Sequence, residues 1–343
     1  MTPRFPSSPL SPSLVLPLLF VVVAVALAFY PLVGETFYVR LMAKIIVLGI
    51  LAMSLDLLVG YTGLVSLGHA AFSGAAGYIT ATLILKAGVT DMALLLPASL
   101  AVSALLALVI GWISVRTSGI YFIMITLALG QMTYLFFHDV SYWGGTDGVT
   151  VWDKPVLAVG GLTLLDLSDR TVFYYTAWAC LVAVYALLWL LMQAPFGQIV
   201  RGVRINPGRT RALGHDVQRY QLAVFVIAGT VAGLAGFLEV ARSGFISPAH
   251  LGWHESAMVL IIVILGGMGT LVGPVIGALT LVLLEDWVAD LTSHWKLAVG
   301  LFVIAVVLFL PNGLVSLLTR GAGPPWLRRR RAAPAEAEGG DDG

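Results

Sequence analysis

Charged side chains are scarce in this sequence of 343 residues, in which Asp, Glu, Lys and Arg together make up 11%. A soluble domain carries about 25% charged residues, whereas 59% of the residues here are hydrophobic. The charges cluster between apolar runs long enough to cross the roughly 30 Å hydrocarbon core of a bilayer. The alternation of apolar and polar residues that marks a membrane β-barrel is missing. The sequence therefore predicts an all-α polytopic membrane protein.

Lysine is rare, and this rarity bears on the energy source of any transport. None of the four lysines, at positions 44, 86, 154 and 296, stands in a Gly-Lys-Ser/Thr context. A phosphate-binding P-loop is therefore absent, and the chain cannot hydrolyse ATP by that route. The formal net charge of +1 gives no reason to expect nucleic acid as a partner.

Cysteine and histidine offer little reactive or metal-binding chemistry. The single cysteine, Cys180, lies in an apolar run and cannot form an internal disulfide. Two histidines at predicted outer boundaries stand directly beside an acid, in the pairs 138–139 and 254–255. Adjacent residues lack the spacing of metal ligands on one helix face. We therefore expect no metal site, no cofactor bound by this chain and no enzymatic activity.

Ionisable residues away from the ends of the apolar runs are also few, and the mid-segment candidates are Asp56, His69 and Glu239. Ion-coupled carriers usually bury several such groups, so their scarcity disfavours a proton relay. We expect Asp56 to lie near the cytoplasmic end of its segment, close to water. Glu239 precedes Arg242 by one helical turn, which suggests an ion pair at a helix end. His69 is interpreted first as a packing histidine and second as a substrate contact.

Ten apolar segments are expected to form membrane helices, some of them short or broken at Gly or Pro. They cover residues 14–33, 38–59, 66–86, 92–115, 118–138, 173–193, 220–241, 256–267, 272–290 and 295–315. Residues 1–13 would form a cytoplasmic N-terminal tail, and 14–315 the transmembrane domain. Residues 316–343 would form a disordered cytoplasmic tail, whose run Arg328–Arg331 could contact anionic lipid headgroups.

The distribution of charge predicts the orientation of the segments. The loop 139–172 holds five aspartates against one lysine and one arginine, a net charge of −3, and the loop 194–219 holds five arginines against one aspartate, a net charge of +4. The positive-inside rule places the basic loop in the cytoplasm and the acidic loop outside. Alternation then puts both termini in the cytoplasm. Arg40 and Lys44 contradict the rule, so either their segment begins later or their side chains reach outward.

Two stretches, 60–77 and 266–277, are unusually rich in glycine for membrane helices. Glycine allows helix backbones to pack closely, and dense glycine also allows a helix to break where the freed backbone lines a cavity. Broken helices in corresponding halves of a chain indicate a transport site. We expect close packing for most of these glycines and a translocation pathway along the two stretches. The candidate pathway residues are Tyr61, Gly63, Ser66, Gly68, His69, Gly266, Gly267 and Gly269.

The basic loop 194–219 contains a short helix signal of its own. Asn206 can cap a helix whose first position is Pro207, and Gly214 can end it in the left-handed conformation. Asp216 can cap the next long helix. A helix of two turns is marginal in water, so it requires docking to a neighbour. We favour a cytosolic partner over a simple lipid anchor.

Several blocks of the sequence resemble the high-affinity branched-chain amino acid ABC transporter permeases, and in particular the larger of the two permease types. The blocks are GYTGLVSLGHAAFSGAAGY from Gly60, VRTSGIYFIMITLALGQM from Val115, GGTDGV from Gly144, FGQIVRGVRINPGRTRALGHDVQRYQLAVFVIAGTVAGLAG from Phe196, PAHLGWHE from Pro248 and GGMGTLVGPVIG from Gly266. The resemblance extends over roughly residues 35 to 315, with the blocks in the expected order.

The resemblance implies a membrane assembly in which this chain forms a pathway with a second permease subunit. Two cytoplasmic ATPase subunits would drive transport, and a soluble extracytoplasmic binding protein would deliver branched-chain amino acids across the bacterial inner membrane. Arg209, Ala212, Leu213 and Gly214 occupy the positions of the loop that docks on the ATPase, and we include Asn206, Arg211 and His215 in this coupling site. The family usually carries acidic residues where this chain has residues 205–208, and this departure concerns the detailed ATPase contacts and not the role of the loop.

Other functions remain open from the sequence. Similar permeases move urea or short amides, and others could take aromatic amino acids. An ion-coupled secondary carrier or a passive channel would each work without other subunits.

Overall fold

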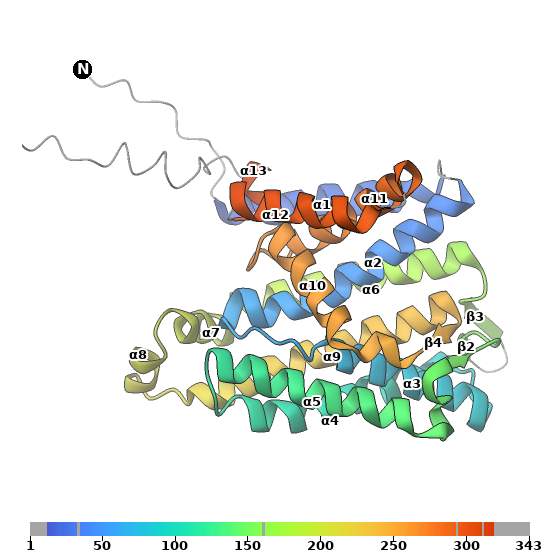
Figure 1. Ribbon diagram of the computed structural model, residues 1–343, viewed down its shortest axis with the longest axis horizontal. Helices are drawn as coiled ribbons and strands as arrows, with labels where there is room; N and C mark the ends of the chain where they lie inside the picture. The colour runs from blue at the N-terminus through green and yellow to red at the C-terminus, as the bar shows by residue number, and fades with distance from the viewer. Residues whose placement is uncertain (1–11, 33–34, 160–161, 293, 311, 319–343) are drawn as a thin grey trace, which may run out of the picture.

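The computed structural model describes residues 12–32, 35–159, 162–292, 294–310 and 312–318 (Figure 1). The predicted N-terminal tail lies almost entirely outside these ranges, as does the arginine run proposed to contact lipid. Where the predicted C-terminal tail is described, it begins as part of a short helix, α13 (Val315–Leu318).

Helices build nearly the whole described structure, and each of the ten predicted apolar segments corresponds to one of them. These ten helices are α1 (Pro12–Phe29), α2 (Thr36–Asp56), α3 (Ala70–Ala87), α4 (Met92–Ser114), α5 (Ile120–Asp139), α6 (Arg170–Gln193), α9 (Val217–Ser243), α10 (Trp253–Gly266), α11 (Gly273–Leu291) and α12 (Trp295–Phe309). Within the described residues, six helices are long and apolar enough to cross a membrane. The chain is therefore an all-α polytopic membrane protein.

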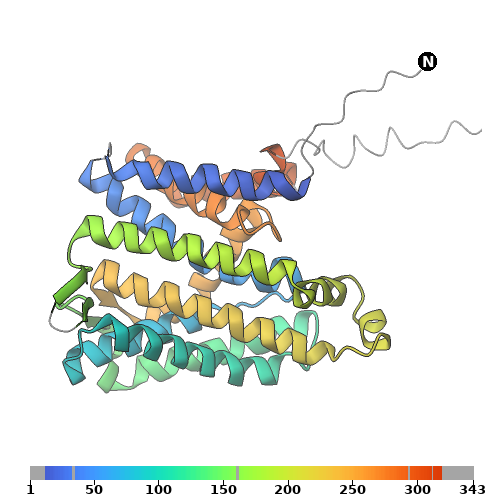
Figure 2. The same ribbon diagram turned by 180° about the vertical axis from the view of Figure 1, so that it is seen from behind.

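The acidic and the basic loop lie at opposite ends of the helix bundle. The basic loop forms two helices, α7 (Pro195–Ile205) and α8 (Pro207–Ala212), at one end (Figure 1). The acidic loop lies at the other end, where β2 (Val156–Val159) and β3 (Leu162–Asp166) form an antiparallel hairpin. Helix α1 begins at the end that carries α7 and α8, and α13 lies there too (Figures 1 and 2). This arrangement agrees with the charge pattern of the two loops.

Short strands at the acidic end were not expected from the sequence. Besides the β2–β3 hairpin, β1 (Val149–Thr150) pairs antiparallel with β4 (Phe245–Ile246), which directly follows α9. This second pairing joins the acidic loop to the end of α9 by backbone hydrogen bonds. It involves residues about a hundred positions apart, and such long-range pairing leaves no local periodicity to detect.

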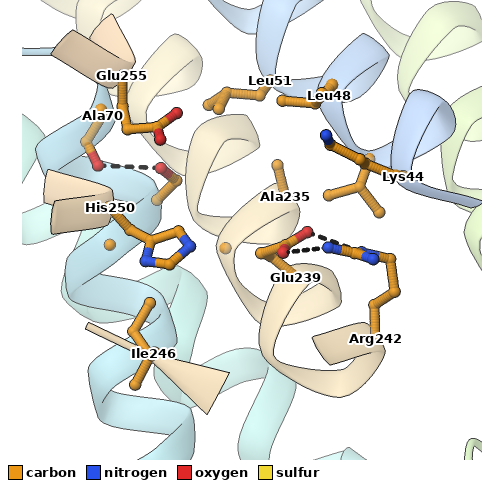
Figure 3. A pocket seen from close by; sticks show the side chains of 14 residues that line it. Lys44, Leu48, Leu51, Ala70, Ala235, Glu239, Arg242, Ile246, His250 and Glu255 are labelled. Atoms are coloured by element: carbon orange, nitrogen blue, oxygen red, sulfur yellow. Dashed lines mark hydrogen bonds and ion pairs between the residues drawn. The ribbon is translucent and has the colours of Figure 1, made fainter. Parts of the chain in front are cut away.

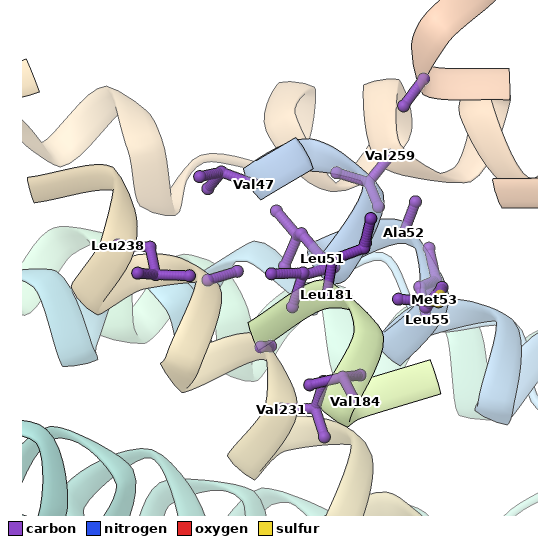
Figure 4. Packing of buried hydrophobic residues seen from close by; sticks show 14 of the residues in the cluster. Val47, Leu51, Ala52, Met53, Leu55, Leu181, Val184, Val231, Leu238 and Val259 are labelled. Atoms are coloured by element: carbon purple, nitrogen blue, oxygen red, sulfur yellow. The ribbon is translucent and has the colours of Figure 1, made fainter. Parts of the chain in front are cut away.

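Helix α2 lies in the middle of the bundle, packed against α6, α9, α10 and α11. Its side chains interdigitate with those of its neighbours, as Leu51, Leu181, Val231 and Val259 show (Figure 4). Lipid tails are as apolar as these side chains, so close van der Waals contact rather than water exclusion holds the helices together. By contrast, α4 and α12 expose large apolar side chains such as Leu105 and Leu301, which suits contact with lipid or another subunit.

The two glycine-rich stretches interrupt the helices. Helix α2 continues as a π-helical turn, η2 (Leu57–Thr62), which ends at Gly63 with a φ of 75°. Residues 63–69 are non-helical, so the prediction that the helix begins at residue 66 is wrong by one turn. The second interruption is the turn 267–272 between α10 and α11, and Pro274 lies in the first turn of α11. The predicted breaks are therefore present in both stretches.

Candidate functional site

The two glycine-rich stretches meet at the side chain of Asp56, the last residue of α2. Its carboxylate accepts hydrogen bonds from the backbone amides of Gly269 at 2.6 Å and Leu271 at 3.2 Å. The side chain is completely buried. The expectation that Asp56 lies close to water is therefore wrong. The turn between α10 and α11 folds over the end of α2, and its amide groups take the place of water around the carboxylate.

Gly60 and Gly269 allow this close approach of the backbone. A Cβ atom at Gly60 would overlap the Asp56 carboxylate and the backbone of Gly269. Gly269 itself has a φ of 77°, a conformation that glycine adopts without strain. The expectation of close packing therefore holds here, since a larger side chain at position 60 would separate α2 from the turn.

His69 and its neighbours are also packed tightly. The His69 Nε2 atom lies 2.8 Å from the hydroxyl of Ser54 on α2, and both residues are fully buried. This hydrogen bond fits the interpretation of His69 as a packing residue that joins the start of α3 to α2. Ser66 is buried, and its hydroxyl has no hydrogen-bond partner within the described residues. Gly68 packs directly against the backbone of α5 at Thr126.

A large cavity opens beside the Asp56 site, toward the end of the bundle that carries α7. Its volume is about 670 Å³, and its lining includes Gly60, Tyr61 and Gly269. Arg201 and Arg204 of α7 line it too. The guanidinium of Arg204 donates a hydrogen bond to the carbonyl of Gly60, and that of Arg201 lies 5.8 Å from the centre of the Tyr61 ring. A carbonyl at the helix break is thus satisfied by a side chain of the basic loop.

The structure therefore brings together some of the predicted pathway residues and separates others. Tyr61, Gly269 and the neighbouring Gly60 share the cavity beside α7. Gly266 and Gly267 instead pack against Gly273 and the residues just before α13. Gly63 is exposed at the end of η2. Their role in a translocation pathway remains a prediction.

Helix α7 was missed in the sequence, although it connects the basic loop to the bundle. Its apolar face buries Gly197, Val200 and Val203, while Arg201 and Arg204 lie on the exposed side. The three-residue spacing of these buried positions, which keeps them near one face of a short helix, was the available signal. The many arginines and the two glycines masked it.

The short helix α8 forms as predicted. The Asn206 side chain accepts a hydrogen bond from the Arg209 amide at 2.9 Å, and Pro207 occupies the first turn. Gly214 follows the helix with a φ of 88°, and the Asp216 side chain accepts from the first amides of α9. Thr210 is the one buried residue of α8. Its backbone carbonyl accepts a hydrogen bond from the backbone amide of His215 at 3.3 Å. These bonds hold α8 in a fixed position relative to α9.

The outer surface of this elbow, residues 205–215, is unusually apolar for a charged loop. Ile205 is 84% exposed and Leu213 is 73% exposed, and both flank the exposed arginines Arg209 and Arg211. Single exposed apolar residues are common, and here two of them lie beside exposed arginines.

At the opposite end of the bundle, Glu239 and Arg242 of α9 form the predicted ion pair. The guanidinium donates two hydrogen bonds to the carboxylate, at 2.6 and 3.0 Å. Arg242 also lines a cavity of about 590 Å³ together with Arg40, Lys154 and Arg170. Partial burial and the nearby charges of Arg170, Arg40 and Arg242 lower the pKa of Lys154.

The helix bounds answer one question about Arg40 and Lys44, which the positive-inside rule does not explain. Helix α2 begins at Thr36, before both residues. A later start of the helix is therefore excluded. Both side chains line cavities at the acidic end of the bundle.

Comparison with known proteins identifies the family. Residues 37–310 match the family described as the permease component of the branched-chain amino acid transport system. The high-affinity branched-chain amino acid transport permease LivM of Salmonella typhimurium is 31% identical over 288 residues, which cover 78% of this chain and 67% of LivM. The LivM of Escherichia coli is 30% identical over 288 residues, which again cover 78% of this chain and 67% of LivM.

More distant similarity reaches sugar permeases. The ribose import permease RbsC of Escherichia coli is 28% identical over 142 residues, or 39% of this chain and 44% of RbsC. No solved structure matches. With the family matched over residues 37–310, the chain belongs to the permease components of the branched-chain amino acid transport system and is a subunit of an ABC transporter.

Proposed function

We propose that this chain imports branched-chain amino acids across a bacterial inner membrane, together with a second permease subunit. Two cytoplasmic ATPase subunits would drive the cycle, and an extracytoplasmic binding protein would deliver the substrate. The observation that carries the proposal is the similarity to two LivM permeases over 78% of the chain. The scarcity of buried ionisable residues agrees with an external energy source.

The basic elbow 205–215 is the proposed contact with an ATPase subunit. Its exposed Ile205 and Leu213 offer apolar anchors, and its arginines offer charge complementarity to an acidic groove. Movement of α8 would pass to α7 through Asn206, which ends α7 and caps α8. Helix α7 would pass it on through the bond from Arg204 to Gly60, at the break after α2. The elbow would thus act on the turn that holds Asp56.

Uptake by a reconstituted transporter tests this function. The chain is co-purified with a second permease subunit and an ATPase subunit and placed in vesicles with a binding protein. We expect labelled leucine, isoleucine and valine to accumulate only with ATP. An ATPase subunit whose P-loop lysine is replaced is the matched control and should give no uptake.

Three outcomes would overturn the proposal. Accumulation by the lone chain under a proton or sodium gradient would identify an ion-coupled carrier. ATP-independent flux of urea would identify a channel. ATP-driven uptake of urea, short amides or aromatic amino acids, without uptake of branched-chain amino acids, would identify a permease of another substrate class.

A further inference from the structure

Charged residues of both signs surround a cavity at the acidic end of the bundle. The cavity has a volume of about 130 Å³ and lies among α2, α3, α9 and α10. A bound water needs about 10–15 Å³ by such a measure, so the space is large enough for a small organic molecule. Lys44, Glu239, Arg242 and Glu255 line it, all of them half-buried (Figure 3).

The four charges sum to zero, but they are not all paired. Glu239 and Arg242 satisfy each other through their two hydrogen bonds. Lys44 and Glu255 form no ion pair within 4.0 Å in the described part of the chain. They face the cavity from different sides, with the Lys44 ammonium on α2 and the Glu255 carboxylate at the start of α10 (Figure 3). Glu285 of α11 lies close enough to both for an electrostatic interaction.

An apolar surface lies between these two free charges. Leu48 and Leu51 of α2 lie along the side of the cavity between Lys44 and Glu255 (Figure 3). Ile246 of β4 adds a further aliphatic side chain to the lining. One positive group, one negative group and an aliphatic surface between them match the three recognisable parts of an aliphatic amino acid.

The innermost part of the cavity reaches the helix break in the first glycine-rich stretch. Ala70, Ser73 and Gly74 line it from the first turns of α3, which begins at Ala70. The Ala70 amide donates to the hydroxyl of Ser256 of α10 at 3.0 Å. The cavity thus extends from the acidic end of the bundle to the start of a broken helix, a setting in which transporters bind substrates.

Burial of charge at this place requires a reason. Charged side chains within membrane segments are costly and usually mark functional sites, and Lys44 also contradicts the positive-inside rule. A neutral ligand without formal charges, such as urea, would not require two unpaired charges of opposite sign.

We propose that this cavity is a binding site for a zwitterionic aliphatic amino acid on its way through the permease. Lys44 binds the substrate carboxylate, Glu255 binds the substrate ammonium, and Leu48 and Leu51 contact the aliphatic side chain. The inference rests on the proposed function for its substrate class, and it adds the place of binding and the residues that select for a zwitterion.

Neutralising either charge in the complete transporter tests the site. We expect Lys44→Met and Glu255→Gln each to lower the leucine imported per ATP hydrolysed by about tenfold or more, since an unpaired substrate charge costs at least 1.4 kcal/mol. The charge-retaining variants Lys44→Arg and Glu255→Asp should stay within about threefold of wild type. Lys86→Met and Glu35→Gln, at exposed positions away from the cavity, serve as matched controls and should not change the ratio.

If Lys44→Met and Glu255→Gln both import as much leucine per ATP hydrolysed as the wild type, the proposed binding site is contradicted. The proposed function would be unaffected by that result. Absence of leucine uptake by the wild type would instead overturn the proposed function. A measurement independent of these variants uses Leu51→Cys in a Cys180→Ala background, with thiol labelling from outside. Leucine-loaded binding protein and ATP should slow labelling relative to unloaded binding protein, and an equal rate in both conditions during active import would contradict the site.

Discussion

The Asp56 carboxylate accepts a hydrogen bond from the backbone amide of Gly269, which lies 213 residues further along the chain. This bond joins the end of α2 to the turn between α10 and α11, and so joins the two glycine-rich stretches. Arg204 of α7 reaches the same place through the carbonyl of Gly60. One small region therefore connects the centre of the bundle with the basic elbow.

Replacement of Asp56 by Ala should destabilise the protein strongly. The substitution leaves the half-buried amide of Gly269 and the buried amide of Leu271 without an acceptor, and an unsatisfied buried group costs about 1–3 kcal/mol. Thermal unfolding of the purified protein in detergent measures the effect. Asp153→Ala, at an exposed position in the acidic loop, is the control and should leave the unfolding temperature unchanged. Equal unfolding temperatures for both variants would show that the Asp56 bonds contribute no stability.

Two glycines in helical segments should respond oppositely to alanine. Gly60→Ala forces a methyl group into the Asp56 carboxylate and the Gly269 backbone, and overpacking of this kind costs about 1–3 kcal/mol or more. Gly300→Ala on α12 meets no atom within 4 Å and should stabilise by about 0.4–1 kcal/mol. Thermal unfolding of the two variants in detergent measures both changes in stability. An unfolding temperature of Gly60→Ala equal to that of the wild type would show that the turn 267–272 does not pack closely against η2.

Arg204 should matter for transport more than for stability. In Arg204→Met, the carbonyl of Gly60 loses its donor and α7 loses its link to the helix break. We expect the complete transporter to assemble but to import substrate about tenfold more slowly. The lost charge-assisted hydrogen bond contributes about 1.5–3 kcal/mol, and about 1.4 kcal/mol corresponds to a tenfold change. Arg219→Met is the matched control, since Arg219 is exposed and pairs only with Asp216 in the described structure. Equal uptake by both variants would exclude transmission through Arg204.

The geometry of Gly214 gives a further prediction for the elbow. Its φ of 88° is closed to proline, whose ring fixes φ near −65°, whereas asparagine tolerates left-handed conformations. Gly214→Pro should therefore abolish uptake while the protein still inserts in the membrane, and Gly214→Asn should retain most uptake. Simultaneous replacement of Arg209 and Arg211 by Glu should also abolish uptake. Wild-type uptake by the proline variant or the double variant would refute the coupling role.

Much of the fold could be predicted from the sequence because its strongest signals are local. Uninterrupted apolar runs identify membrane helices, and the caps of α8 follow from Asn206, Pro207 and Gly214 within a few residues. The ion pair of Glu239 with Arg242 is equally local, since one helical turn separates the two residues. The breaks in the glycine-rich stretches could be predicted because dense glycine and proline weaken a helix wherever they occur.

The features that escaped prediction depend on distant partners. In the sequence, Asp56 has the position of a solvated residue at a helix end. Nothing near it in the sequence indicates that the distant turn 267–272 covers it. The position of Lys44 is explained only when α2, α3, α9 and α10 enclose a cavity around it. The signal for helix α7 is local, but it is weak. The apolar face of this helix is narrow and consists only of Gly197, Val200 and Val203, with arginines between and beside them.

The basic elbow 205–215 must lie in the cytoplasm if an ATPase subunit is to bind it. The most direct measurement is thiol labelling of Arg211→Cys in a Cys180→Ala background with a membrane-impermeant reagent. Asp153→Cys in the acidic loop is the positive control and should be labelled in intact cells. We expect Arg211→Cys to be labelled only after the membrane is permeabilised, and labelling of this residue in intact cells would contradict a cytoplasmic elbow.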